Sequence, residues 1–287
     1  MIPKIIIQTG KDNNHNDAVL AAIQSWKDLN PEYEYKYFTD KDCDEFILQN
    51  FHKDVRLAFN LLKPGAMKAD LFRYCYLFIK GGVYTDLDNI CIRPIDEWMN
   101  CEKEEFVTML DLAYLEERSK ESNDLLPKVK HDLIYQAFIA SRPDNPIFKK
   151  CIDHIVINTL NRVMPDDGLA PWWSPQYCGP TIKLTGPKLL ADIINQHIGM
   201  PVTSSFKLGL IKTDKIYIRF AGQLRNINMT SSNENNMWNQ MQTITDLQGQ
   251  SIIDVKYVGY EPGEDTYHLA KFPNEIYNYR LKLKDLK

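Results

Sequence analysis

The segment 65–88, GAMKADLFRYCYLFIKGGVYTDLD, constrains the fold more than any other part of this chain. Residues 65–80 have helical spacing. Pro64 precedes them and two glycines follow, as at the start and end of a helix. A short apolar run then leads to Asp86 and Asp88. A helix, a glycine turn and an apolar strand in this order predict an α/β fold in which two carboxylates end a sheet strand.

Patterns before this segment predict the same class of fold. Residues 4–9 are a β-branched run that predicts a buried strand, and residues 17–29 have helical spacing. Residues 30–38 predict a second strand with alternating aromatic residues, and residues 39–51 a second helix with acids in its first turn. The β-α-β-α order predicts a largely parallel sheet with helices on its faces.

The rest of the chain has weaker patterns. Residues 105–110 and 251–260 predict strands, residues 131–164 predict two helices, and residues 187–198 predict another helix. We find no internal repeat and no linker that would divide the chain, so the sequence predicts a single domain over residues 1–287.

Composition argues against several classes of protein. The net charge is -4 without a long basic run, and nucleic acids require a concentrated positive surface. The six cysteines form no Cys-x-x-Cys pair, which disfavours a zinc cluster or a disulfide framework and favours a reducing compartment. No window reaches the roughly 18 apolar residues of a membrane span. We therefore expect a cytoplasmic protein (in the host cytoplasm if viral), with its oligomeric state open.

Asp86 and Asp88 are the first candidates for a functional site. Side chains two residues apart in an extended segment point to the same side, so both carboxylates are expected at the C-terminal end of a strand. Their oxygens favour a bound Mn²⁺ or Mg²⁺ ion, and the alternative is a solvated turn. Asp70 and Arg73 share one face of the preceding helix, as an exposed ion pair or as the lining of a pocket.

Three stretches resemble glycosyltransferase family 32, whose members carry a DXD sugar-binding region. They are IPKIIIQT at the N-terminus, KPGAMKADLFRYCYLFIKGGVYTDLD in the middle and CGPTIKLTGPKLL further on. The family is similar to capsular-polysaccharide and fungal mannosyl-type transferases, and the clostridial glucosylating toxins share its central block. The residues that match this block position for position are Asp70, Arg73, Tyr84, Asp86 and Asp88.

The resemblance implies a GT-A fold, which is Rossmann-like with a mostly parallel central sheet and helices on both faces. Residues 1–112 would form the nucleotide-sugar half, and residues 113–287 the acceptor-side half with helical and loop insertions. The implied activity is that of a metal-dependent, retaining hexosyltransferase of the kind used in polysaccharide biosynthesis. It would use Mn²⁺ or Mg²⁺ and a nucleotide-diphospho-sugar, UDP favoured over GDP, with a glycan or other hydroxyl acceptor.

The resemblance also implies roles for individual residues. Asp70 and Arg73 would hold the donor sugar and the diphosphate side and, with Asp86, act in catalysis. Asp86 would meet the ribose or sugar and the metal, and Asp88 would be the firmer metal ligand. His268 is a further candidate metal ligand, against the alternative of a partly exposed histidine in a tail loop. The remaining substrate-binding candidates are Gln8, Thr9, Tyr84 and Gln136.

Two other functions stay open on the residues alone. An Asp-x-Asp phosphohydrolase needs an apolar strand that ends directly at its first aspartate, and Thr85 before Asp86 and Asn89 after Asp88 fit this poorly. A non-catalytic nucleotide-sugar or glycan-binding module would keep Gln8 without needing the metal pair. The choice between front-face substitution and double displacement also stays open.

Overall fold

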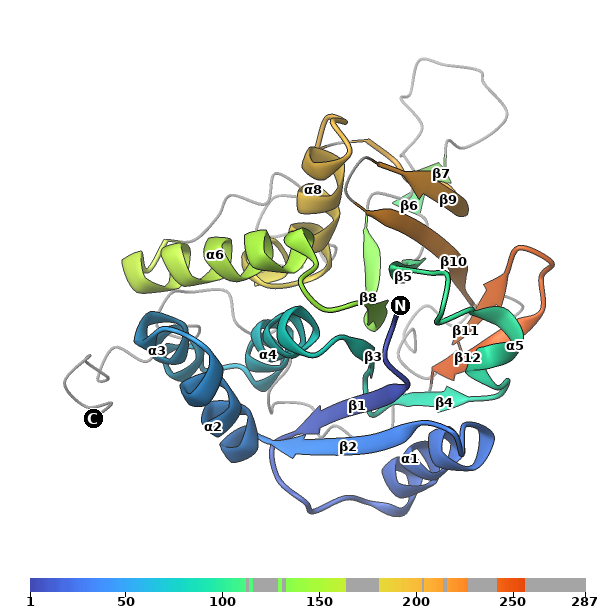
Figure 1. The fold of residues 1–287 in the computed structure, drawn as a ribbon, viewed down its shortest axis with the longest axis horizontal. Helices are drawn as coiled ribbons and strands as arrows, with labels where there is room; N and C mark the ends of the chain where they lie inside the picture. Colours follow the sequence, from blue (N-terminus) through green and yellow to red (C-terminus); the bar gives the residue numbers. More distant parts are fainter. Residues whose placement is uncertain are drawn as a thin grey trace.

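The computed structural model describes residues 1–111, 114–115, 129–130, 133–163, 181–202, 204–213, 216–226 and 242–255. This part of the chain forms one large sheet with helices on both sides (Figure 1). The helices are α1 (Asp17–Leu29), α2 (Asp40–Asn50), α3 (Lys53–Leu61), α4 (Gly65–Ile79), α5 (Ile95–Trp98), α6 (Pro146–Asn161), α7 (Thr181–Leu184) and α8 (Pro187–His197).

The large sheet has ten strands in the described part of the chain. The strands before the sequence midpoint are β1 (Ile5–Gly10), β2 (Glu34–Thr39), β3 (Gly82–Thr85), β4 (Asn89–Cys91), β5 (Phe106–Leu110) and β8 (Ile134–Ser141). The later ones are β9 (Gly209–Lys212), β10 (Tyr217–Asn226), β11 (Gln242–Asp246) and β12 (Ser251–Val255). A separate pair is formed by β6 (Tyr114–Leu115) and β7 (Val129–Lys130).

The strand order is β2-β1-β3-β8-β5-β10-β11-β12-β4, with β9 beside β10. The neighbours β1–β2, β1–β3 and β5–β10 are parallel, and the other six pairs are antiparallel. Following these pairings, β1, β2, β3, β5, β10 and β12 run in one direction. The predicted α/β class is confirmed, but the sheet is mixed. β8 is inserted between β3 and β5 and runs opposite to both, so two adjacent pairs become antiparallel.

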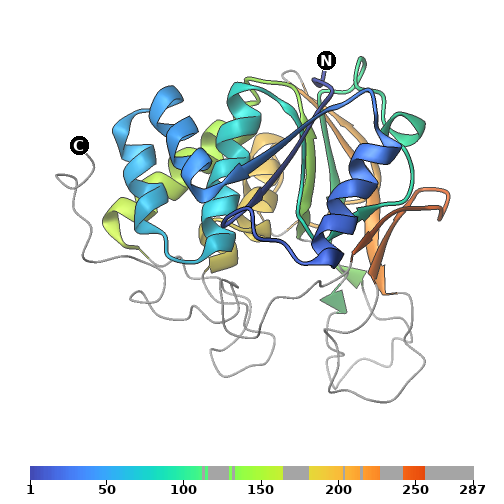
Figure 2. The ribbon, with the colours of Figure 1, turned by 90° about the horizontal axis from the view of Figure 1, so that it is seen from below.

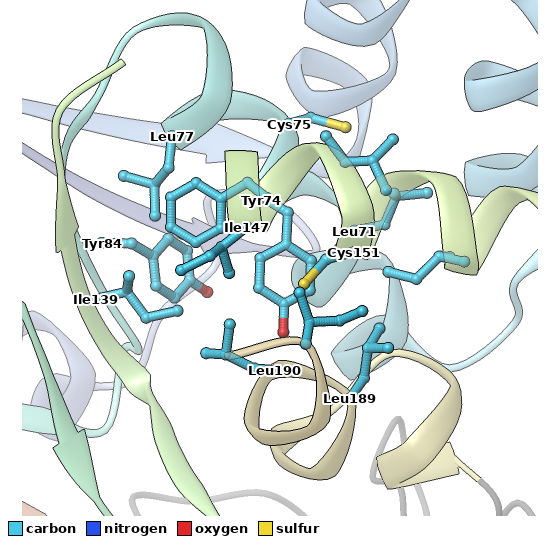
Figure 3. Packing of buried hydrophobic residues seen from close by; sticks show 14 of the residues in the cluster. Leu71, Tyr74, Cys75, Leu77, Tyr84, Ile139, Ile147, Cys151, Leu189 and Leu190 are labelled. Atoms are coloured by element: carbon cyan, nitrogen blue, oxygen red, sulfur yellow. The ribbon is translucent and has the colours of Figure 1, made fainter. Parts of the chain in front are cut away.

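Helices α2, α3, α4, α6 and α8 cover one face of the sheet, and α1 and α5 cover the other (Figures 1 and 2). Alternate strand residues divide between the two faces. Ile7 and Tyr84 enter the larger core, whereas Ile6 and Val83 enter the core beneath α1. Figure 3 shows the larger core, where α4, α6 and α8 meet the sheet residues Tyr84 and Ile139. This packing fixes α4 against the strand that leads to the paired aspartates.

Local signals explain the element ends. Helix α1 spans the predicted residues, and its N-cap is Asn16, whose side chain accepts from the Val19 N–H. Thr39 and Asp42 form a capping box at α2. None of the helices described has the length and apolar character that crossing a membrane requires.

The prediction of two helices over residues 131–164 is half wrong. α6 is a helix, capped by Asn145, but residues 134–141 form the buried strand β8. A short apolar run does not distinguish a buried strand from a buried helix by its spacing. Here the free edges of β3 and β5 lie on either side, and pairing with both satisfies the backbone of the segment.

Candidate functional site

The paired aspartates lie where β3 ends beside the parallel strand β1. β3 ends at Thr85, and the Asn89 N–H then donates to the Asp86 carbonyl at 3.2 Å. Asp86 and Asp88 therefore occupy a turn between β3 and β4, not the extended segment that the sequence predicts. The turn lies at the carboxyl ends of two parallel strands, which is where open α/β sheets bind ligands.

One oxygen of Asp86 is bound by the protein. Its Oδ1 accepts from the Tyr84 hydroxyl at 2.8 Å and lies 3.2 Å from Arg73 Nη2. The Asp86 side chain is nevertheless 33% exposed. The protein therefore binds one oxygen of this carboxylate, and part of the group stays accessible to a ligand.

Arg73 is the buried cation of the site, with 3% of its side chain exposed. Its Nη2 lies 3.1 Å from Asp70 Oδ1, and its Nη1 donates to the Gln136 carbonyl at 2.8 Å. The guanidinium also lies over the Tyr84 ring, 4.3 Å from its centre. Burial lowers the pKa of Arg73, but Asp86, Tyr84 and Asp70 outweigh burial and raise the pKa above its ordinary value. Arg73 therefore stays charged.

Asp70 is fully buried behind Arg73. Besides the arginine, its Oδ1 accepts from Gln136 Nε2 at 2.7 Å and its Oδ2 from Thr185 Oγ1 at 2.8 Å. Burial raises the pKa of Asp70 to about 7, although Arg73 and these donors oppose the rise. The prediction that Asp70 and Arg73 share a helix face is confirmed, and they form a buried ion pair rather than an exposed one.

Asp88 carries the feature that points to a ligand. Its Oδ1 is buried and has no hydrogen-bond partner in the described ranges. Burial and the nearby Asp86 raise the pKa of the Asp88 carboxyl to about 7. A buried carboxylate oxygen without a donor, next to a second carboxylate, fits a hard divalent cation. Within the described ranges no group of three or more acidic, Cys or His side chains is positioned for a metal, and His268 lies outside them.

Gln8 and Thr9, two of the predicted substrate-binding residues, are positioned against the same turn. Gln8 is fully buried, donates from Nε2 to the Asp86 carbonyl at 3.0 Å and accepts from the Tyr35 hydroxyl at 2.7 Å. Thr9 Oγ1 lies 3.1 Å from the Tyr84 hydroxyl. Both residues therefore support Asp86, one through its backbone and the other through Tyr84.

Asn89 is a site residue that the sequence pattern did not assign. Its Nδ2 donates to Thr85 Oγ1 at 3.0 Å and to the Ala137 carbonyl at 2.8 Å, and its Oδ1 accepts from Tyr135. Asn89 thus closes the turn and ties it to β8. A polar residue placed directly after Asp86-x-Asp88, before an apolar strand, is the signal that could have indicated it.

A comparison with protein families confirms the resemblance for part of the chain. Residues 16–106 match the family described as glycosyltransferase sugar-binding region containing DXD motif. The matched range includes Asp70, Arg73, Asp86 and Asp88. Residues 16–106 are therefore similar to the DXD-containing sugar-binding region of glycosyltransferases.

Similar curated proteins are fungal. Over 104 residues the chain is 39% identical to the initiation-specific alpha-1,6-mannosyltransferase of Candida albicans, covering 34% of this chain and 27% of that protein. Over 95 residues it is 38% identical to inositol phosphoceramide mannosyltransferase 3 of Schizosaccharomyces pombe, covering 33% and 26%. The matches thus span about a quarter of the length of these relatives.

Two solved structures match about 70% of this chain with TM-scores below 0.5. PaToxG glycosyltransferase matches with a TM-score of 0.44 and 18% identity, over 69% of this chain and 70% of that chain. The catalytic domain of alpha-toxin from Clostridium novyi matches with a TM-score of 0.40 and 10% identity, over 71% and 75%.

Proposed function

We propose that this chain is a metal-dependent, retaining glycosyltransferase that moves a hexose from a nucleotide-diphospho-sugar to a glycan or other hydroxyl acceptor. The observation that carries the proposal is the series of ion pairs Asp70–Arg73–Asp86, beside an oxygen of Asp88 that has no hydrogen-bond partner in the described part of the chain. It lies at the ends of two parallel strands and inside the range that matches the DXD sugar-binding region.

Asp86 and Asp88 would hold the divalent cation, Mn²⁺ or Mg²⁺. When bound, the ion supplies positive charge for the diphosphate leaving group. Tyr84 and Arg73 both bind Asp86 Oδ1, which leaves the opposite side of this carboxylate for a ligand. The Asp88 Oδ1, which has no hydrogen-bond partner among the described residues, would give the second anionic oxygen.

Arg73 would balance the negative charge of the site. Two aspartates and a diphosphate repel one another, and a guanidinium buried between Asp70 and Asp86 reduces that repulsion. Because Asp70 and the Gln136 carbonyl hold it in place, its charge is oriented before the donor binds. Thr9, exposed in part beside Tyr84, is the described residue of β1 best placed to meet the nucleotide.

We propose only the class of the donor, a nucleotide-diphospho-sugar. The resemblance to family 32 favours UDP-sugars over GDP-sugars, whereas the relatives that match about a third of the chain are named mannosyltransferases. Those names favour a mannosyl donor, so the test must present UDP-hexoses and GDP-mannose side by side.

The test is a donor panel read by mass spectrometry. The purified chain is incubated with UDP-glucose, UDP-galactose and GDP-mannose, each with Mn²⁺ and each with excess chelator. We expect release of the nucleoside diphosphate from one class of donor, and loss of this release in chelator. Asp88→Asn should lower the rate of nucleoside diphosphate release by on the order of 100-fold, because a hard cation needs anionic oxygen.

Asp153→Asn is the matched control, since Asp153 pairs with Lys149 on the exposed side of α6. It should keep the activity of the parent. Equal activity of Asp88→Asn and Asp153→Asn would contradict the proposal. Release of phosphate from simple phosphate esters would favour a phosphohydrolase, and donor binding without turnover would favour a binding module.

A further inference from the structure

We infer that Thr185, in the turn between α7 and α8, is a positioning residue for the proposed transfer reaction. It holds the Asp70 carboxylate, which in turn holds Arg73 against Asp86. The inference rests on the proposed function and extends it to a part of the chain outside residues 16–106, the range of the sugar-binding match.

The contact is direct and buried. Thr185 has no exposed surface, and its Oγ1 donates to Asp70 Oδ2 at 2.8 Å across 115 residues of sequence. The turn that carries Thr185 is tight. A Cβ at Gly186 would lie 2.8 Å from the Ile182 Cα, so glycine is needed for α7 and α8 to approach this closely. The backbone therefore fixes the direction of the Thr185 Cα–Cβ bond, and the hydrogen bond to Asp70 holds the hydroxyl.

A second path joins the same residues. The Tyr74 hydroxyl lies 2.8 Å from Gln136 Oε1 and 3.1 Å from the Thr185 carbonyl, and Gln136 Nε2 donates to Asp70 Oδ1. Asp70, Gln136, Tyr74 and Thr185 thus form a closed ring of polar contacts, in which the Tyr74 hydroxyl shares its one proton between Gln136 Oε1 and the Thr185 carbonyl. In Figure 3 the Tyr74 hydroxyl points away from α4 toward the helix that carries Leu189 and Leu190. The ring connects α4, β8 and the α7–α8 turn.

The ring fixes both oxygens of Asp70. Arg73 and Gln136 bind Oδ1, and Thr185 binds Oδ2, so rotation of the carboxylate would break at least one of these bonds. Arg73 uses the same Nη2 atom for Asp70 and for Asp86. A shift of Asp70 therefore moves the charge that supports Asp86. The hydrogen bond from the Thr185 hydroxyl goes to Asp70, so Thr185 acts on Asp86 only through Asp70 and Arg73.

The inference is tested with Thr185→Val, which keeps the shape of the side chain and removes the donor. Thr159→Val is the matched control, because Thr159 is equally buried, in α6, and its Oγ1 has no hydrogen-bond partner within the described ranges. Thr185→Ser restores the hydroxyl. Tyr74→Phe removes the hydroxyl that links Gln136 to the Thr185 carbonyl and keeps the packing of the aromatic side chain. For each variant the turnover number and KM for the donor accepted by the parent are measured, together with the melting temperature.

We expect Thr185→Val to lower the turnover number by on the order of tenfold or more, with donor KM within about threefold, because misplacement rather than lost binding is the cause. Tyr74→Phe should change it in the same direction. Thr185→Ser should recover most of the loss, and Thr159→Val should match the parent at temperatures where all variants are folded.

The outcomes distinguish a failure of the proposed function from a failure of the role inferred for Thr185. A parent that consumes no donor overturns the proposed function, and this inference with it. An active parent with equal turnover in Thr185→Val and Thr159→Val overturns the inference alone. So does a Thr185→Ser variant that is as slow as Thr185→Val, since the hydroxyl would then not be the group that acts.

Discussion

Arg73 Nη2 lies 3.2 Å from Asp86 Oδ1 and so joins helix α4 to the turn that carries the paired aspartates. The same atom lies 3.1 Å from Asp70 Oδ1, and the arginine is nearly fully buried. A charge in such a place is stable only while its partners remain. The arrangement therefore makes the two carboxylates and the arginine depend on one another for stability as well as for chemistry.

Arg73→Ala should destabilise the protein by about 3–5 kcal/mol, because it leaves Asp70 buried without its cation. Asp70→Asn in the same background should recover part of this loss, since the neutral amide needs no cation. The free energy of unfolding in urea, measured for both single variants and the double variant, gives the coupling. Strictly additive losses would show that the two residues do not act as a pair.

Asp88→Asn should leave the metal-free protein as stable as the parent, or more stable by up to about 1 kcal/mol. The substitution removes a buried charge that lies near Asp86 and whose Oδ1 has no donor in the described ranges. Added Mn²⁺ should raise the melting temperature of the parent and not that of the variant. A clear drop in the melting temperature of metal-free Asp88→Asn would mean that the carboxylate is part of the folded framework instead.

Asn89→Asp should cost about 3 kcal/mol, although the side chain keeps its size. Nδ2 donates to the Thr85 hydroxyl and to the Ala137 carbonyl. The hydroxyl can turn to donate to a carboxylate, but the carbonyl can only accept, so an aspartate oxygen would face it without a proton between them. Asn16→Asp is the control. Asn16 caps α1 through its side-chain oxygen, a role that aspartate performs equally well, so its unfolding free energy should change by less than about 0.5 kcal/mol.

Gly82→Ala should destabilise far more than Gly249→Ala, although both glycines have positive φ. Gly82 has φ 111° and an added Cβ would lie 2.8 Å from the Ile5 carbonyl oxygen, whereas nothing lies within 4 Å at Gly249. We expect a loss of about 1 kcal/mol at Gly249 and more than about 3 kcal/mol at Gly82. Urea unfolding of the two variants measures the difference, and equal losses would contradict the close approach of β1 and β3.

Asp44 should make stability depend on acid pH. Burial alone would raise the pKa of Asp44, but hydrogen bonds from Arg56 and Asn60 outweigh it and hold the pKa below its ordinary value. The unfolded chain then binds the proton first, so the stabilisation is present above about pH 4 and is lost as the pH falls through the folded pKa. Asp44→Asn should cost about 1 kcal/mol at pH 7, and the difference should shrink toward pH 3. A difference that stays constant with pH would exclude the ion pair as its source.

Short-range patterns determined a large part of the structure. Helix α4, the glycines after it and the strand that leads to Asp86 all follow from spacing and turn chemistry within 65–88. These features are local because a helix or a strand buries one face at a fixed period. The pair Asp86 and Asp88 could be identified for the same reason, although their turn conformation could not.

Only the tertiary structure decided the partners of those residues. β8 is a strand because β3 and β5 offer edges to it, and that places Gln136 beside Asp70 across 66 residues of sequence. Thr185 reaches the same carboxylate from still further along the chain. The sequence by itself thus determined which charged residues gather at the end of β3. Packing of α4 against β8 and the α7–α8 turn decided how those charges are satisfied, because hydrogen-bond partners distant in sequence leave no periodic signal.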